Sequence, residues 1–350
     1  MEKLPLETQT LYAELIERLT AIEAERTMGH SPGCFTEKEV KGRPYYYYQY
    51  QDPGGRIRQI YIGRKTRELE VIAARYRSHR EIVKTDLAHL QVLCAQLRAG
   101  GALMTDTASG RVLKALADSG IFYLDGILLG TQAFIVLGNL LGIRWDHSTL
   151  RTQDIDLGGT KKMSIALPEI KADLPGILEG LEMGFIPVPP FNPKHPSTSF
   201  RVRGTPLRLD VLTPEKHLRK SEPVFLPRFK VAAQPVRFLD YLIEDPIKGV
   251  IINGGGVLVN IPQPARFALH KLIVSQEREL TFHSKIQKDM TQAAQLLHIL
   301  LEERPGDLIL AWEEIKKKGA GWMKRIKNAL YVRSSPQSSI LKRTASFLKI

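Results

Sequence analysis

The sequence predicts an α+β protein, with a mixed β-sheet core between helical regions. Residues 6–27 and 66–99 repeat their apolar side chains at helical spacing, and the chain becomes helical again from Pro264 onward. Between these regions, short β-prone runs alternate with turns rich in Gly and Pro. We expect a helix, β-hairpin and long-helix region at 1–104, a sheet core at 105–262 and a helical, basic C-terminal region at 263–350.

Composition indicates a globular protein. Of the 350 residues, 43% are hydrophobic and 25% are charged. Cys34 and Cys94 are too few for a disulfide framework, which favours a reducing compartment, and we expect a cytoplasmic protein. Residues 121–143 are apolar enough to suggest a membrane span, but Asp125, Gln132 and Asn139 interrupt them. A buried strand that enters a buried helix explains this segment better, so we expect no membrane partner.

The positive charge lies at two places in the chain. The net charge is +13, of which residues 31–100 contribute +6 and residues 311–350 contribute +8. Residues 1–30 carry −3 and residues 101–310 carry +2. A polyanionic partner at the two basic regions is one interpretation, and a basic surface without a partner is the other.

The first hundred residues predict two helices and a hairpin. The hairpin turns at residues 52–55, and Thr66 can cap the helix that follows it. That helix carries a heptad seam, which is typical of a helix packed along another helix. Its partner is either residues 6–27 or a second copy of the chain, which would make a homodimer. The seam consists of Leu69, Tyr76, Val83, Leu90 and Leu97.

Tyrosines and cations share the hairpin. Tyr45 to Tyr48 and Tyr50 lie near Lys41, Arg43, Arg56 and Arg58. The rings could stack on bases while the cations meet phosphates, or alternate tyrosines could simply cover a helix. The run Lys316 to Lys318, with Lys324, Arg325 and Lys327, is likewise either a solvated face or a phosphate contact.

The core region predicts short alternating elements. Ser109 can cap a helix at 110–119, which precedes a strand at 121–129, a helix at 132–141 and a strand at 154–157. Two hairpins follow, one at 199–203 with 207–212 and one at 250–253 with 257–261. Three helices are then expected, at 266–275, 285–303 and 308–328, before a flexible tail at 334–339.

Three aspartates carry the chemistry. Asp154 and Asp156 lie two residues apart on a predicted strand, so they share a face, and hard carboxylate ligands at this spacing suit Mg²⁺. Two surface aspartates at a strand end are the simpler alternative. Asp210 lies within an apolar strand, where a charge needs a partner. An adjacent antiparallel strand could bring it to the pair, and three carboxylates can hold two metal ions for phosphoryl transfer.

A turn and two charged residues complete the candidate site. Gly130 and Thr131 lie between a strand and a helix N-terminus, where backbone N–H groups can approach an anion. Lys271, in an apolar segment, is either a phosphate partner or a snorkelling lysine. Asp289, just after Lys288, is either part of the site or a solvated helix residue. The histidines show no His-x-His or His-Glu-x-x-His spacing, which argues against a zinc site, and His270 is expected to be a packing neighbour.

Residues 115–303 resemble the polymerase-β-like nucleotidyltransferase superfamily, and more closely the bacterial nucleotidyltransferase-domain proteins related to AbiE-type abortive-infection toxins. The likeness is carried by LLGTQAFIVLGNLLGI, RTQDIDL, LRLDVL, PARFALHKL and KIQKDMTQAAQLL. It implies NMP transfer from an NTP, two Mg²⁺ ions on the aspartates and the triphosphate at Gly130-Thr131. It also implies that Lys271 and Asp289 form a toxin-like second half of the site.

The sequence thus favours a Mg²⁺-dependent nucleotidyltransferase. Asp154 and Asp156 are expected to bind the metal, Asp210 to bind metal and activate the acceptor hydroxyl, and Lys271 to help hold the triphosphate. RNA is the acceptor suggested by the basic regions. The alternative is a non-catalytic nucleic-acid-binding protein on a degenerate transferase scaffold.

Overall fold

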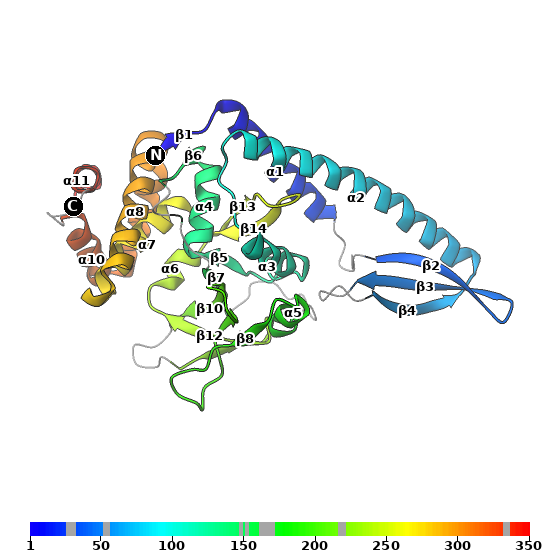
Figure 1. The fold of residues 1–350 in the computed structure, drawn as a ribbon. Coiled ribbons are helices and arrows are strands. Elements are labelled where there is room, and N and C mark those ends of the chain that lie inside the picture. Colours follow the sequence, from blue (N-terminus) through cyan, green and yellow to red (C-terminus); the bar gives the residue numbers. More distant parts are fainter. Residues whose placement is uncertain are drawn as a thin grey trace.

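The fold has three parts that follow one another along the chain (Figure 1). A computed structural model describes residues 1–25, 33–51, 57–146, 150, 154–160, 172–215, 222–331 and 337–350. The parts are an N-terminal arm, a central mixed sheet with helices, and a helical C-terminal part. This arrangement confirms the α+β expectation. Across the described ranges, the structure contains no helix of the length and apolarity that a bilayer crossing needs.

The central sheet runs in the order β11-β12-β10-β7-β5, with β9 beside the first half of β10 and β8 beside β9. The strands β7 and β10 are parallel, and β5 and β9 run antiparallel to their neighbours. The predicted antiparallel pairing of the Asp210 strand with the Asp154 strand is therefore wrong. The long connection between them, which contains α5 and two strands, lets the chain return in the same direction. The strands are β5 (Ile127–Leu129), β7 (Asp154–Gly158), β8 (Phe185–Pro187), β9 (Ser199–Val202), β10 (Arg208–Pro214), β11 (Val224–Leu226) and β12 (Val231–Val236).

Helices and a separate hairpin surround this sheet. The buried residues of the sheet and of these helices form one continuous apolar core, which extends into the C-terminal helices. The hairpin expected at 250–261 is present, and its strand β14 contacts β5. The elements are α3 (Thr107–Asp118), α4 (Gly130–Leu140), β6 (Ile143–Arg144), which pairs with β1 (Glu2–Lys3), α5 (Leu174–Gly180), α6 (Leu239–Ile243), β13 (Ile247–Ile251) and β14 (Val257–Ile261).

The strand expected at 121–129 is shorter than predicted, because a turn occupies its first part. Asp125 has a positive φ of 62°, and the N–H of Gly126 donates to the Ile121 carbonyl at 2.9 Å. The buried amide of Asn260 donates to the carbonyls of Phe122 and Gly126. A side chain distant in sequence thus fixes this apolar segment as a turn.

The cap predicted for the helix before this segment is also wrong. The N-cap of α3 is Asp106 and not Ser109. The side chain of Asp106 accepts a hydrogen bond from the N–H of Ser109 at 3.0 Å. Ser109 is the third residue of the helix, within its first turn, and is buried. Both residue types favour the N-cap position, so composition alone does not separate them.

The N-terminal arm consists of two antiparallel helices and a small sheet. The helix α2 (Arg67–Ala99) has 33 residues and begins at Thr66, whose hydroxyl accepts from the Leu69 N–H as predicted. At 1.5 Å per residue it is about 50 Å long, and it extends from the body to the lobe on the right of Figure 1. The expected hairpin is part of a three-stranded sheet, and its turn at 52–55 lies outside the described residues. The other elements are α1 (Leu6–Glu25), β2 (Gly33–Val40), β3 (Arg43–Gln51) and β4 (Ile57–Arg64).

The heptad seam of α2 packs within the chain. Leu90 and Leu97 are buried against α1 and the β13–β14 hairpin, where Tyr12 exchanges hydrogen bonds with the backbone of Val250. Tyr76, farther along the seam, packs against the ring of Phe35 in the small sheet. The side chain of Val83 lies outside the described residues. The seam therefore has two partners, a helix at one end and a sheet at the other.

The C-terminal part contains more helices than the sequence predicted. The helix expected at 308–328 is broken at Gly319, whose φ of +106° a helix cannot contain. Ser338, in the tail expected to be flexible, begins a helix, and the first part of that tail lies outside the described residues. The elements are α7 (Pro264–Glu277), the 3₁₀ turn η2 (Leu280–Phe282), α8 (His283–Glu303), α9 (Pro305–Lys318), α10 (Ala320–Leu330) and α11 (Ser338–Phe347).

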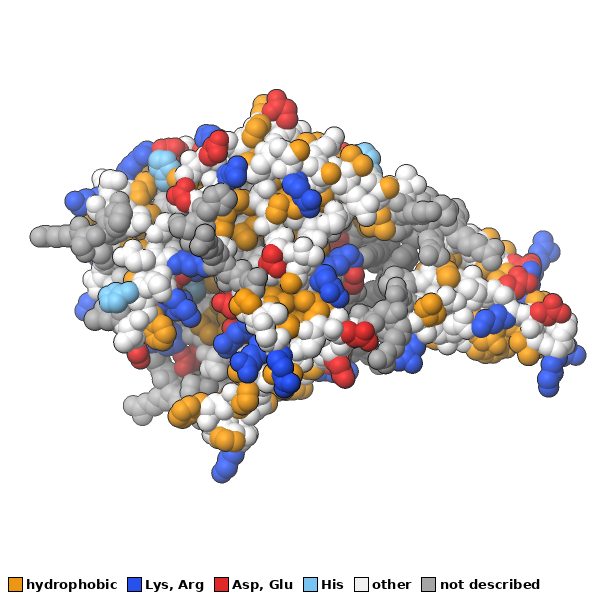
Figure 2. Space-filling model, viewed as in Figure 1, with side chains coloured by type: hydrophobic (Ala, Val, Ile, Leu, Met, Phe, Trp, Pro, Cys, Tyr) orange, Lys and Arg blue, Asp and Glu red, His pale blue; other side chains and the backbone are white. Residues whose placement is uncertain are grey.

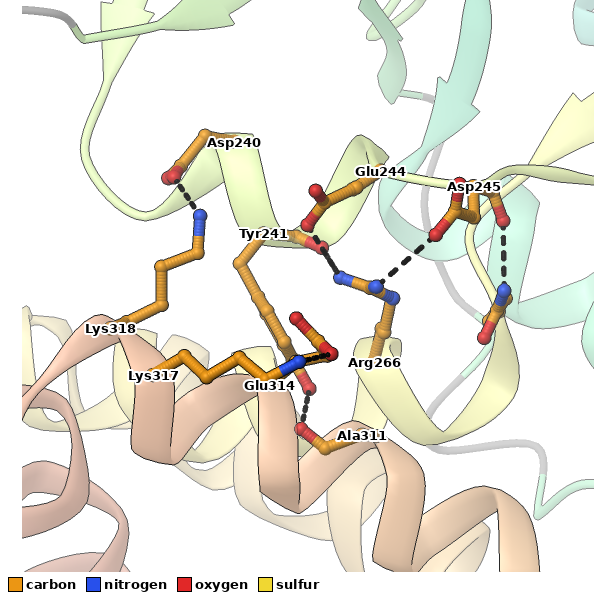
Figure 3. A network of polar contacts seen from close by, with 10 residues as sticks. Asp240, Tyr241, Glu244, Asp245, Arg266, Ala311, Glu314, Lys317 and Lys318 are labelled. Atoms are coloured by element: carbon orange, nitrogen blue, oxygen red, sulfur yellow. Dashed lines mark hydrogen bonds and ion pairs between the residues drawn. The ribbon is translucent and has the colours of Figure 1, made fainter.

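A polar network fastens these helices to the core (Figure 3). Arg266 on α7 is buried and donates to the Tyr241 carbonyl at 3.1 Å and to Glu244 at 3.0 Å. Its guanidinium also donates to Asp245, and the Tyr241 hydroxyl donates to the Ala311 carbonyl of α9 at 3.0 Å. The buried charge thereby gains the partners that its burial requires.

Candidate active site

The predicted aspartates lie on one face of the central sheet. In the parallel register of β7 and β10, Asp210 is directly beside Asp156, and Arg208 is beside Asp154. Side chains two residues apart on a strand share a face, so Asp154 and Asp156 project on the same side. Alternation leaves Ile155 and Leu157 to the core, where both are fully buried. Local periodicity therefore presents the three carboxylates together.

Gly130 makes room for one of these carboxylates. Leu129 on β5 is in register with Asp156, and the chain turns at Gly130 with a φ of +60° into α4. A Cβ built on Gly130 would lie 2.0 Å from Oδ2 of Asp156. Only glycine can therefore occupy this position while Asp156 keeps its place.

The electrostatic environment of Asp156 is unfavourable for its charge. Burial, and then the neighbouring charge of Asp210, raise its pKa from 3.8 to about 6. Lys271 acts in the opposite direction, while Asp154 adds to the increase. A nearby cation would stabilise the charged form of a carboxylate in this position.

Asp210 contacts two polar neighbours, Arg208 and Ser199. The Arg208 guanidinium donates to Oδ1 of Asp210 at 2.8 Å, and the Ser199 hydroxyl donates to the same oxygen. Arg208 also donates to Ser199 at 3.0 Å. The arginine therefore compensates the Asp210 charge in this conformation.

The donor set suits Mg²⁺, although it is not gathered around one point. Carboxylate oxygens are the ligands that this hard ion prefers. Across the described ranges, no three acidic, histidine or cysteine side chains are close enough to hold an ion as they stand. Asp156 lies against Gly130 while Oδ1 of Asp210 is paired with Arg208, so an ion that binds this oxygen competes with Arg208.

The N-terminus of α4 is the candidate phosphate site. The helix begins at Gly130, and its N-cap residue Leu129 supplies no side-chain hydrogen bond to the first turn. The first N–H groups of a helix have no partner within it and, with the helix dipole, attract anions. Thr131 is buried in this turn. The turn lies next to Asp156, which brings the phosphate site and the aspartates together.

Lys271 and Asp289 form a buried ion pair beside the aspartates. Nζ of Lys271 lies 2.6 Å from Oδ1 of Asp289, and Nε of Arg278 lies 2.7 Å from Oδ2. Burial opposes the charge of Asp289, but Lys271 and Arg278 outweigh it and hold its pKa below the ordinary value. Both oxygens of Asp289 are thus occupied, while Lys271 acts on Asp156 from the same neighbourhood.

The sequence analysis did not identify three residues near the site. Arg208 and Ser199 contact Asp210. Lys288 lies close enough to Asp154 and Asp156 for their charges to act on its pKa. Burial, and then Lys271, lower the pKa of Lys288. The signal for Arg208 was its spacing of two from Asp210 on a strand, which places the two side chains on one face. No comparable pattern pointed to Ser199 or Lys288.

His270 behaves as a packing residue. Its ring is buried, and burial together with the neighbouring Lys271 charge lowers its pKa to about 3. Within the part of the chain that the structure describes, Nε2 has no hydrogen-bond partner. The ring is therefore neutral at ordinary pH.

A cavity of about 380 Å³ opens beside Asp210. It begins at Ser199 and Arg208, which both touch or approach Asp210, and it continues under the loop that joins β8 to β9. Phe191 on this loop is fully exposed. The remaining lining residues are Val188, Pro189, Pro190, Asn192, His195, Pro196, Thr198, Pro223 and Gln234.

The basic run on α9 is neutralised by acidic neighbours (Figure 3). Lys317 pairs with Glu314 at 2.6 Å and Lys318 pairs with Asp240 at 2.7 Å. Lys316 pairs with Glu313. These contacts favour the solvated, structural interpretation of this run over a phosphate contact.

Comparison with known proteins gives two family matches. A family model described as "Nucleotidyltransferase" matches residues 107–317, and one described as "Domain of unknown function (DUF6788)" matches residues 2–71. Neither the curated proteins nor the solved structures yielded a match. The first match spans the central sheet, all three aspartates and the Lys271–Asp289 pair.

Proposed function

The chain belongs to the nucleotidyltransferase family, whose model covers more than half of it, and from this membership we propose a Mg²⁺-dependent enzyme that transfers NMP from an NTP to an acceptor hydroxyl. The observation that carries the proposal is the register of β7 and β10, which sets Asp210 beside Asp156 next to the Gly130 turn. The likeness to AbiE-type toxins stays a prediction.

Asp154 and Asp156 would hold the metal, with Asp210 joining them after it leaves Arg208. Bound Mg²⁺ supplies charge stabilisation for the phosphoryl oxygens in an in-line displacement. The first N–H groups of α4, at Gly130 and Thr131, would receive the triphosphate. Lys271 would add a positive charge to that end of the site, and Asp289 would position Lys271.

Asp210 would accept the proton of the acceptor hydroxyl. The acceptor oxygen then bonds to the α-phosphorus, the bond from that phosphorus to the β-phosphate oxygen breaks, and pyrophosphate leaves. Asp210 lies on the opposite side of Asp156 from Gly130, because β10 and β5 flank β7. The acceptor should therefore enter from the β10 side.

The cavity beside Asp210 is our proposed acceptor site. Its prolines and Phe191 offer flat apolar surface, while Asn192 and Gln234 offer amides. This mixture of apolar walls with a few polar groups is typical of small-molecule sites and suits a planar base. The terminal nucleoside of an RNA strand fits this chemistry.

Incubation of the purified chain and Mg²⁺ with each α-labelled NTP tests the proposal. RNA, protein and small alcohols are offered as acceptors in parallel, and label in one of them identifies the acceptor class. Asp154→Ala, Asp156→Ala and Asp210→Ala should each abolish transfer with the fold intact. Asp307→Ala, at an exposed helix position, is the control. Full transfer by the Asp156 variant would exclude this site as the catalytic centre.

A further inference from the structure

The small sheet of the N-terminal arm has two chemically different faces. Phe35 contacts the rings of Tyr46, Tyr48 and Tyr76, and Tyr76 belongs to α2, so this face lies toward the helix. Tyr46 is buried there. These tyrosines pack toward the helix, which is one of the two roles open from the sequence, and the burial of Tyr46 keeps its ring from a ligand.

The opposite face presents a second set of aromatic rings. Alternation along β3 places Tyr45 and Tyr47 on it, and the ring of Tyr61 on β4 lies 5.9 Å from Tyr45 and 5.6 Å from Tyr47. Tyr61 is 56% exposed. This trio, which we call the outer tyrosines, forms an aromatic surface outside the molecular core.

Cations surround the outer tyrosines. Lys38 and Arg64 both pair with Tyr45 in the sheet register, and Arg43 lies two residues before it, so all three share its face. Nζ of Lys38 lies 5.3 Å from the centre of the Tyr47 ring. Figure 2 shows the lobe standing apart from the body, with Lys and Arg side chains at its far end.

Acidic residues of the same strands lie on the other face. Glu37 is in register with Tyr46 and pairs with Lys65 at 3.0 Å, and Glu39 is in register with Pro44 on the same side. In the described part of this sheet, the positions that share the face of Tyr45 include no Asp or Glu. The segregation gives the outer face a positive charge that complements a polyanion.

We infer that the outer face of the β2–β4 sheet binds single-stranded nucleic acid. Bases stack on the outer tyrosines, since every base offers a π-face, and Lys38, Arg43 and Arg64 meet the phosphates. Gln49 and Gln59, which hydrogen-bond to each other across the same face, add amides that can reach base edges. The surface belongs to the segment matched by the domain of unknown function, and its binding does not depend on nucleotidyl transfer.

Fluorescence anisotropy with the full chain tests this inference. Labelled oligouridylate and oligothymidylate are titrated in EDTA without NTP, so metal-dependent chemistry takes no part. We expect saturable binding that weakens with salt, and the tighter oligomer identifies RNA or DNA as the ligand. Absence of binding to both oligomers overturns the inference. Saturable binding without any transfer of label would leave this inference standing and count against the transferase proposal alone.

Matched variants locate the surface. Tyr61→Ala should weaken binding by about five-fold or more, as loss of one stacked base does, and Tyr61→Phe should keep it. Tyr331→Ala is the control. Tyr331 lies on the C-terminal part and is 55% exposed, which is nearly the same exposed fraction as that of Tyr61. Arg64→Ala should reduce the log–log salt slope by about 0.7, whereas Lys114→Ala on α3 should not. Wild-type binding by Tyr61→Ala and Arg64→Ala, with unchanged melting curves, places the ligand elsewhere.

Discussion

The carboxylate of Asp156 fills the space that any side chain on Gly130 would need. A Cβ at that position would meet Oδ2 at 2.0 Å, and the φ of +60° already favours glycine. The contact joins two elements of the site, since Gly130 begins the phosphate-binding helix and Asp156 is the buried carboxylate of β7. Both the backbone conformation and the neighbouring carboxylate of Asp156 thus require glycine at position 130.

Gly130→Ala should abolish transfer while the fold survives. The positive φ costs about 1 kcal/mol with a Cβ, and the methyl group displaces Asp156 from its place. Gly254→Ala is a matched control, because Gly254 has a φ of +58° with nothing within 4 Å of its Cβ position. Both variants should lose similar backbone stability in melting curves, but only Gly130→Ala should lose activity. Equal activity of the two variants would contradict the role of the contact.

Asp156→Asn should stabilise the metal-free protein at neutral and basic pH. The folded pKa of about 6 lies above the ordinary value of 3.8 for this side chain. The unfolded chain therefore releases this proton first, and stability falls as pH rises from 3.8 through 6. A shift of this size corresponds to about 3 kcal/mol.

Melting curves across pH measure this effect. The variant should melt above the wild type at about pH 8, and the two should converge below about pH 3, where the carboxyl is protonated in both the folded and the unfolded state. Mg²⁺ should raise the wild-type melting temperature more than that of the variant. A variant that is less stable at the higher pH would show that Asp156 is already well compensated.

The aspartates could be found from sequence because a strand repeats every two residues. Asp154-Ile155-Asp156-Leu157 alternates charge with apolar side chains, and this pattern fixes which residues face the core. The same logic placed Asp210 in a strand. The direction of that strand was not predictable, because a connection of nearly fifty residues permits either pairing.

Other features depend on contacts that sequence patterns do not contain. The amide of Asn260 sets a turn at Phe122–Gly126 from a distance of more than a hundred residues. The choice between the two roles of the tyrosines depended on the position of α2, which covers only the Tyr46 and Tyr48 side. The alternation of side chains along β3 predicts that the tyrosines divide between two faces of the small sheet. Which face packs against α2 depends on the tertiary structure.

Asp289→Asn should destabilise the fold strongly. It leaves Lys271 and Arg278 without their shared carboxylate in a site where Asp289 is only 3% exposed, and loss of one partner of a buried pair costs about 3–5 kcal/mol. Lys271→Met should cost less, since Arg278 still pairs with Asp289. The double variant should recover part of the loss, and a thermodynamic cycle measures the coupling. Additive losses would show that the two side chains act independently.

Arg208→Gln should make the protein more responsive to Mg²⁺. Arg208 donates to Oδ1 of Asp210 and, together with the larger effect of Lys271, opposes the rise in the pKa of Asp156, so it is one of the cations that serve the metal-free site. Without it, Asp156 and Asp210 repel each other with less compensation, and the metal-free melting temperature should fall. A metal ion that binds only the folded state stabilises it by mass action, and Arg208 no longer competes for Asp210. The rise in melting temperature on addition of Mg²⁺ should therefore be larger in the variant than in the wild type.

Arg201→Gln is the control, because Arg201 is the neighbour of Arg208 in the β9 register and lies one strand farther from Asp156. An equal Mg²⁺ response in all three proteins would mean that Asp210 does not exchange Arg208 for the metal.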